Sequence, residues 1–238
     1  MPDWAGQFHA FSLLHAVTVA LFGALWAALI LIGLRLRGQE RESRWRQLLG
    51  SLLLFAWLIA NGVQLLPGRF DAAVNLPLQV CDIAGLLAAF ALWSHNRQLR
   101  AILYFWGVGF SIQAILTPEL ASGPAHVDYW TFWVPHANLT GAACYILIVE
   151  RFRPRWSDCW QAYALALLYL ALILPFDLVS GFNYGYVGTS MPSQQTILEL
   201  LGPWPWRVVS MMALAALGFV LLQWPWNSAV ARRSEAAQ

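Results

Sequence analysis

The sequence FSLLHAVTVALFGALWAALILIGL, residues 11–34, contains no charged side chain, and five arginines follow it between residues 35 and 46. A stretch of about 20 mostly apolar residues is long enough to cross the hydrocarbon core of a bilayer as a helix. An apolar run that ends at a basic cluster is typical of a span that stops at the cytoplasmic surface. We therefore predict an integral membrane protein. Because Asp3 precedes this span and the span is too long for a signal-peptide core, we expect it to be retained.

Six further charge-poor stretches of similar length follow along the chain. Together with the first, they predict an all-α fold, in which residues 1–238 form one transmembrane domain built as a seven-helix bundle. The spans are expected near residues 11–34, 47–66, 76–93, 101–117, 129–149, 159–179 and 206–224. Twelve of the fourteen arginines lie in alternate links or after the last span, and only Arg69 and Arg207 lie on the other side. This bias predicts an N-terminus outside and a C-terminus, with a short tail at 229–238, in the cytoplasm.

The composition excludes several classes of protein. Of the 238 residues, 59% are hydrophobic and 11% are charged, with a net charge of +2, whereas a soluble domain carries about 25% charged residues. A soluble enzyme is therefore excluded, and nothing suggests a nucleic-acid partner. The absence of lysine excludes Schiff-base chemistry. The three cysteines, at positions 81, 144 and 159, lack CxxC spacing, so neither a disulfide framework nor a cysteine zinc site is indicated.

Uncharged polar side chains gather near the outer ends of the predicted spans. At the helical rise, Cys81 lies about 8 Å and His136 about 10 Å inside the outer ends of their spans, so the two are level. Such residues either form interhelical hydrogen bonds or line a cavity. Pro135 favours a cavity beside His136, because freed backbone at membrane depth usually lines one. The same layer is predicted to contain His15, Asn61, Gln64, Gln113, Thr117 and Asp177.

A cysteine and a histidine at one depth suggest nucleophilic catalysis. A buried thiol is mostly neutral at pH 7 and needs a base beside it. Cys81 and His136 are therefore a candidate catalytic dyad that forms an acyl-thioester, with a third group to orient the imidazole and donors to stabilise an oxyanion. The candidates for orientation are Asp82, Asp177, Asn183 and His15, and those for the oxyanion are Gln113, Asn61 and Asn183.

Two other interpretations stay open. His15, His136, Asp82 and Asp177 are residue types that bind a hydrolytic zinc, although no HExxH or paired histidine spacing supports a metal. The polar layer would also suit a non-catalytic transporter, channel or lipid-binding protein, in which Cys81 is a packing residue. We expect neither a metal nor a cofactor.

The long outer link, residues 180–205, carries aromatic side chains and ends in the run GPWPW at residues 202–206. Each proline removes a backbone donor and restricts the residue before it, so this run is not regular helix. The link is either a lid over the site or an aromatic anchor at headgroup depth. The candidate substrate-binding residues are Tyr184 and Trp204 in this link and Asn61, Gln64 and Thr117 in the spans.

Several motifs occur in order along most of the chain. They are LPLQVCDIAGLLA at 76–88, YFWGVGFSIQAILTP at 104–118, FWVPH at 132–136, RFRP at 151–154, NYGY at 183–186 and LGPWPW at 201–206. On these motifs the chain resembles the bacterial YwaF-like family of integral membrane proteins. That family is similar to the eukaryotic transmembrane-protein-164 acyltransferase and, more distantly, to the androgen-induced-gene and ADTRP lipid hydrolases. The resemblance implies a multi-pass protein of the bacterial inner membrane.

The resemblance also implies which residues act. The cysteine of LPLQVC is Cys81 and the histidine of FWVPH is His136, and together they would transfer or hydrolyse fatty-acyl groups. A membrane lipid is then the acyl donor, and a lyso-lipid or water is the acceptor. The family tends to show a lysine before proline where this chain has Met191-Pro192. The resemblance therefore does not extend to head-group preference.

Overall fold

The computed structural model describes residues 3–190 and 197–235, and this part of the chain is helical, without a β-strand. The α-helices are α1 (Asp3–Gly6), α2 (Leu13–Leu36), α3 (Glu40–Gln64), α4 (Val80–Ser94), α5 (Arg97–Gly109), α6 (Ser111–Leu116), α7 (Val127–Ile148), α8 (Trp156–Ser180) and α9 (Trp206–Glu235). Two short 3-10 helices are η1 (Tyr184–Tyr186) and η2 (Ile197–Leu201). The all-α prediction is confirmed.

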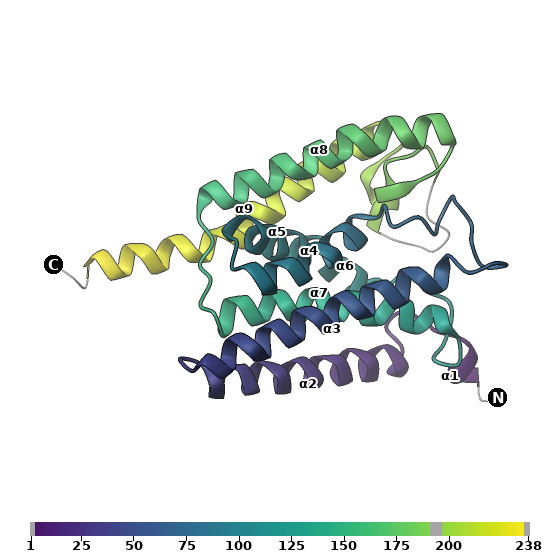
Figure 1. The fold of residues 1–238 in the computed structure, drawn as a ribbon. Coiled ribbons are helices and arrows are strands. Elements are labelled where there is room, and N and C mark those ends of the chain that lie inside the picture. Colours follow the sequence, from purple (N-terminus) through teal and green to yellow (C-terminus); the bar gives the residue numbers. More distant parts are fainter. Residues whose placement is uncertain (1–2, 191–196, 236–238) are drawn as a thin grey trace.

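The long helices run back and forth between two ends of a bundle (Figure 1). One end holds the short links at residues 37–39, 95–96 and 149–155, and we call it the arginine-rich end. The opposite end holds α1 and the segments 65–79, 117–126 and 181–190, and we call it the hollow end. Consecutive long helices therefore run in opposite directions.

Helix α4 lies in the middle of the bundle, where it packs against α3, α5 and α7. Its side chains Ala84 and Ala88 are fully buried and small enough for the neighbouring helices to approach closely. Gly141 of α7 serves the same purpose, because a Cβ at that position would lie 1.9 Å from the ring of Trp26 in α2. Small residues thus place α4 and α7 at the centre.

Five segments of the described chain are long and apolar enough to cross a membrane. They are Leu13–Leu36, Glu40–Gln64, Arg97–Leu116, Trp156–Ser180 and Trp206–Asn227. Their outward surfaces are apolar, since side chains such as Leu21 in α2 and Leu172 in α8 are exposed. Apolar surfaces of this extent are expected of helices that face lipid.

Three details differ from the spans expected from sequence. The stretch expected near 101–117 is divided into α5 and α6 at Phe110, after two glycines that weaken helix formation. Helix α4 begins only at Val80, because Pro77 disfavours helix just before it. Helix α9 begins at Trp206, the last residue of the proline-rich run, and continues to Glu235 through most of the expected tail. Residues 236–238 lie outside the described residues.

Candidate functional site

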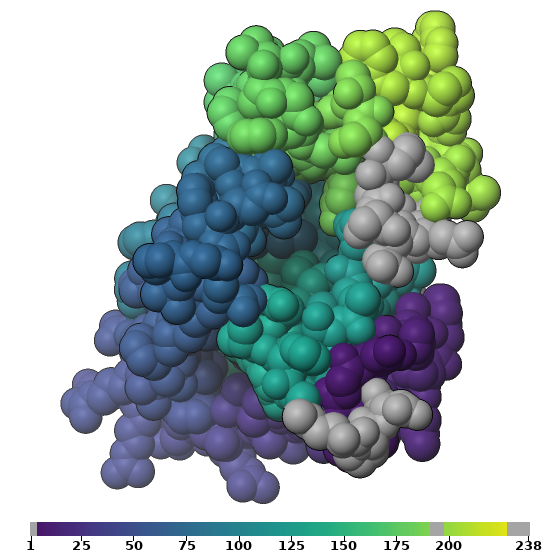
Figure 2. Space-filling view, turned by 90° about the vertical axis from the view of Figure 1, so that its right-hand side faces the viewer, coloured from purple at the N-terminus to yellow at the C-terminus, as the bar shows by residue number. Residues whose placement is uncertain are grey.

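The hollow end carries the candidate site. Figure 2 looks onto this end and shows a hollow bordered by segment 65–79, the start of α7 and the segment that follows α8. These parts are far apart in the sequence and meet because α4, α7 and α8 each have one terminus at this end. The hollow leads toward the interior helices of the bundle (Figure 2).

Cys81 is the second residue of α4, and its thiol lies beside Ser111. The Sγ atom of Cys81 is 3.8 Å from the Oγ atom of Ser111, the first residue of α6. Ser111 is fully buried, whereas Cys81 is half-buried. The unpaired backbone N–H groups at the start of a helix favour negative charge. The sulfur therefore lies beside a hydroxyl group and in the first turn of α4.

Asp82 links the start of α4 to the histidine. Its Oδ2 atom accepts a hydrogen bond from the backbone N–H of Gln79, the N-cap residue, at 3.2 Å. The carboxylate also lies close enough to His136 and to Cys81 to interact electrostatically with both. The indole Nε1 of Trp57 donates to the backbone oxygen of Asp82 at 2.8 Å. One side chain therefore caps the helix and faces the imidazole.

His136 lies in α7 directly after Pro135. Its Nδ1 atom is 2.7 Å from the backbone oxygen of Phe132, and its ring stacks on the ring of Phe132 with centroids 4.4 Å apart. Because a carbonyl oxygen only accepts, this hydrogen bond assigns the proton to Nδ1. In the neutral imidazole, Nε2 is then the acceptor, which is the form a general base needs.

Cys81 and His136, the predicted dyad, are connected through the side chain of Asp82. Asp82 interacts with the imidazole of His136 and with the thiol of Cys81. The phenols of Tyr169 and Tyr186 interact with the same two acidic groups. Among the described residues, no hydrogen bond joins Cys81 to His136 directly. The structure thus gathers five titratable side chains at the start of α4.

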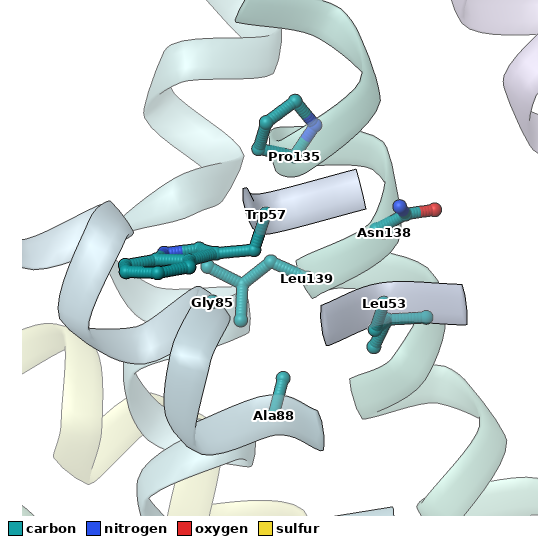
Figure 3. Close-up of a pocket in the computed structure, with 7 residues that line it drawn as sticks. All are labelled: Leu53, Trp57, Gly85, Ala88, Pro135, Asn138 and Leu139. Carbon is teal, nitrogen blue, oxygen red and sulfur yellow. The ribbon is translucent and has the colours of Figure 1, made fainter. Parts of the chain in front are cut away.

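A narrow crevice lies between α3, α4 and α7 beside these residues (Figure 3). Trp57, Gly85, Pro135 and Asn138 are among the residues that line it. Its volume is about 10 Å³, the lower limit for one water molecule. The crevice therefore has no room for an acyl chain, and the wider hollow of Figure 2 is the larger opening at this end.

The segment that follows α8 docks on the residues before α4. The backbone N–H of Gly185 donates to Oε1 of Gln79 at 2.8 Å. The hydroxyl of Tyr184 donates to the backbone oxygen of Ala72 at 2.7 Å, and Oδ1 of Asp177 accepts from the backbone N–H of Tyr184 at 3.0 Å. Tyr184 and Asp177 therefore fix this segment over the N-cap of α4.

Two predicted site residues in the same link bind the backbone nearby. The Nδ2 atom of Asn183 donates to the backbone oxygen of Ser190 at 3.1 Å. The indole Nε1 of Trp204 donates to the backbone oxygen of Val187 at 3.2 Å. Both side chains therefore shape the link. The Met191-Pro192 pair, where relatives are expected to carry lysine, lies outside the described residues.

His15 lies near the start of α2 and bonds to backbone at the hollow end. Its Nδ1 atom accepts from the backbone N–H of Phe11 at 2.9 Å, and Nε2 donates to the backbone oxygen of Ile115 at 2.8 Å. Both ring nitrogens are thus engaged with backbone. Within residues 3–190 and 197–235, no group of three or more His, Cys, Asp and Glu side chains could hold a metal ion.

The remaining predicted polar residues make local or interhelical hydrogen bonds. Gln64 donates to Oγ1 of Thr131 at 3.1 Å and so joins α3 to α7. Asn61 and Thr117 each donate to the backbone oxygen of the residue four positions earlier, at 2.9 Å and 3.1 Å. The side chain of Gln113 is exposed. Of the predicted orienting groups, Asp82 interacts with the imidazole of His136.

Sequence reasoning missed Ser111, Tyr169 and Tyr186. The hydroxyl of Tyr169 donates to the backbone oxygen of Leu78 at 2.8 Å, and that of Tyr186 donates to Oε2 of Glu119 at 2.7 Å. Burial, and then the Glu119 carboxylate, raise the pKa of Tyr186, so this phenol stays protonated. For Ser111, the sequence offered one indication: it is a serine inside an apolar span, two residues after Gly109.

The fold and this arrangement define a class of protein: a multi-pass helical membrane protein with titratable side chains gathered at one end of its bundle. A family model, described as the TMEM164 family, matches residues 8–223, and the chain belongs to this family. No curated protein and no solved structure matches the chain. The family match supports the transmembrane-protein-164 part of the resemblance. The relationship to the YwaF-like and ADTRP groups stays a prediction.

Proposed function

We propose that this chain is a membrane-embedded acyltransferase or acyl-ester hydrolase that acts on membrane lipids, with Cys81 as nucleophile and His136 as general base. The observation that carries the proposal is the arrangement at the start of α4. There the Cys81 thiol lies beside the hydroxyl of Ser111, and the adjacent Asp82 interacts with an imidazole whose Nε2 can accept a proton. Membership of the TMEM164 family adds support.

We also propose that α4 and α7 cross the membrane together with the five apolar segments, which makes seven spans. Helix α4 is short, with 15 residues, and α7 is long enough but carries polar side chains. Both are enclosed by other helices, so less of their surface would meet lipid. The distribution of arginines supports an arginine-rich end in the cytoplasm and an N-terminus on the opposite side of a bacterial inner membrane.

The proposed reaction has two steps. In the first, His136 takes the thiol proton, the sulfur of Cys81 attacks the ester carbonyl of a lipid, and a C–S bond replaces the C–O bond. The departing alkoxide receives the proton from the imidazolium. In the second step, His136 removes a proton from the acceptor hydroxyl, whose oxygen attacks the thioester, and the thiol regains that proton. A lyso-lipid acceptor gives transfer, and water gives a free fatty acid.

Neighbouring groups would support both steps. Ser111 provides a hydroxyl beside the sulfur, where negative charge is present before attack and after departure. The Asp82 carboxylate would stabilise the imidazolium that forms on His136. Asp177 and Tyr184 are positioning residues, because they hold the segment that covers the N-cap of α4.

Lipid mass spectrometry of the purified chain in liposomes tests the proposal. The wild-type protein is expected to change the acyl composition of a phospholipid and lyso-lipid mixture, and Cys81→Ala is expected to lose this activity. Cys144→Ala is the matched control, because Cys144 is also a half-buried cysteine without a disulfide but lies in α7. Equal turnover by wild type and Cys81→Ala would contradict the nucleophile assignment.

The same preparation tests the non-catalytic alternative. A transporter or channel would move solute across liposomes whose lipid composition does not change. Flux that survives Cys81→Ala, together with unchanged lipids in the wild type, would favour that class over an enzyme. Because both measurements use one preparation, they separate the two classes without a second assay system.

A further inference from the structure

A second pocket lies at the arginine-rich end, across the bundle from Cys81. Its volume is about 340 Å³, within the range of about 300–1,000 Å³ typical of ligand pockets. Three links meet around it, between α2 and α3, between α4 and α5, and between α7 and α8 (Figure 1). The charged and titratable residues that line it are Arg37, Glu42, His95, Arg100, Glu150 and Arg151.

An ion-pair network fixes the charges beside this pocket. The carboxylate of Glu150 lies 3.4 Å from Nε of Arg46, forms an ion pair with Arg100 and lies 3.6 Å from Nδ1 of His95. Arg46 also lies 3.9 Å from the carboxylate of Glu42. These partners come from α3, α5 and the links after α4 and α7, so the network holds four parts of the chain in one arrangement.

Some N–H groups of the arginines in this network have no hydrogen-bond acceptor among the described residues. The Nη1 atom of Arg46 and the Nε atom of Arg100 are buried and have no hydrogen-bond partner among the described residues. Arg46 is only 1% exposed. Arg151 lines the pocket, is exposed, and forms no ion pair within the described chain. Arg100 lines the pocket and Arg46 lies behind it, so an anion in this pocket would supply an acceptor oxygen for Arg100.

We propose that this pocket binds a phosphate-bearing anion, either the headgroup of a phospholipid in the adjacent leaflet or a soluble phosphate compound. Guanidinium groups match phosphate oxygens in charge and in bidentate geometry. Arg37 is fixed beside the pocket, because its Nε atom donates to the backbone oxygen of Val149 at 2.8 Å and its Nη2 atom donates to that of Ile148. Arginines outnumber carboxylates around the pocket, so the site has a positive excess that an anion would neutralise.

The state of Glu150 favours such a ligand. Burial raises the pKa of this carboxyl to about 7, although the neighbouring Arg100 and Arg46 oppose the shift. Near neutral pH, a fraction of the protein therefore carries a neutral Glu150, which leaves both guanidinium groups with less compensating charge. The pocket is separate from Cys81 and His136, so the proposal does not depend on the acyl-transfer reaction.

Binding to the purified full chain tests the proposal, with two sources of phosphate as two arms. In the first, inorganic phosphate is titrated at constant ionic strength against the protein in phosphatidylcholine nanodiscs. In the second, native mass spectrometry compares retention of phosphatidate with retention of phosphatidylcholine. Saturable binding of inorganic phosphate identifies a soluble ligand, and selective retention of phosphatidate identifies a lipid headgroup.

Matched arginine variants locate the site. Arg100→Gln and Arg151→Gln are each expected to weaken binding about tenfold, the usual effect of one charge-assisted hydrogen bond. Arg44→Gln is the control, because Arg44 is exposed at the same end and does not line the pocket. If Arg100→Gln does not fold, the exposed Arg151 still provides the test. Absence of binding in both arms, or equal weakening by Arg44→Gln, would overturn the proposal.

Discussion

The two ends of the bundle hold their polar groups in opposite ways. At the hollow end, side chains such as Tyr184 and Gln79 bond to backbone, and ion pairs are peripheral to the cysteine. At the arginine-rich end, full charges pair with one another, as Glu150 does with Arg46 and Arg100. The first arrangement sets a thiol beside the Ser111 hydroxyl and gives His136 an Nε2 atom that can accept a proton, which suits catalysis. The second leaves a cationic pocket, which suits binding.

The contrast is sharpest between the histidines of the two ends. His136→Ala is expected to lower acyl turnover by about 10²- to 10⁴-fold, the usual contribution of a general base. His95→Ala should leave turnover within about twofold, because His95 lies at the other end beside Arg100 and Glu150, where burial lowers the pKa of its imidazole. Lipid mass spectrometry over time measures both rates. A similar loss in both variants would erase the functional distinction between the ends.

A substitution that destabilises the core between the two ends should lower both acyl turnover and phosphate binding. Gly141→Ala is expected to destabilise the protein by about 1–3 kcal/mol, because the added methyl overlaps the ring of Trp26. Gly23→Ala in α2 is the control, since a Cβ there meets no atom within 4 Å. Thermal unfolding in detergent, with turnover and phosphate binding followed in parallel, checks the effect. Loss of only one activity would show that the ends do not share this core.

A smaller effect should distinguish two polar residues of α6. Ser111→Ala is expected to lower turnover about tenfold, because it removes the hydroxyl beside the sulfur of Cys81. Gln113→Ala should have no measurable effect, since this side chain is exposed. Initial rates on one lipid substrate compare the variants at equal folded concentration. If Gln113→Ala is the more damaging change, the oxyanion role expected from the sequence belongs to Gln113 instead.

The smallest expected effect is a pH dependence of anion binding at the arginine-rich end. Sulfate keeps a constant charge near neutral pH, so its binding reports the protein groups. Lowering the pH from about 8 to about 6 should strengthen sulfate binding about fivefold, because Glu150, with its pKa raised to about 7, gains a proton. The charged and titratable groups around it are Arg37, Glu42, Arg46, His95, Arg100, Tyr145 and Arg151.

Glu150→Gln isolates that dependence. The variant should bind sulfate with little change across the same pH range, at an affinity close to that of the wild type at low pH. Since a carboxyl whose pKa is raised in the folded state stabilises the fold at low pH, wild-type stability should also fall as the pH rises through about 7. A pH dependence that persists in Glu150→Gln would assign it to another group.

The sequence alone was enough to predict an all-helical fold, because apolar stretches and arginine clusters are read directly from composition along the chain. It also predicted Cys81 and His136 at similar depth in separate spans. It could not predict that Ser111 faces the sulfur, because that depends on the break between α5 and α6 and on which helices become neighbours.

The role of Asp82 illustrates the same limit. Asp82 was a candidate to orient the imidazole because it follows Cys81 in the sequence. Its capping bond to Gln79 and its interaction with His136, however, depend on where α4 begins. The docking of Gly185 on Gln79 joins segments more than 100 residues apart. Likewise, the arginines predicted the orientation, whereas the pocket that Arg100 and Glu150 line requires three links to meet. Contacts between distant segments were therefore the part that needed the structure.

Detection of an acyl-thioester on Cys81 tests the central claim most directly. After incubation with phospholipid, the peptide that contains Cys81 should carry a fatty-acyl mass in the wild type, and neutral hydroxylamine should remove it. Peptides that contain Cys144 or Cys159 should stay unmodified. Lipid turnover by a wild-type protein that never carries this adduct, or turnover that continues in Cys81→Ala, would contradict the account.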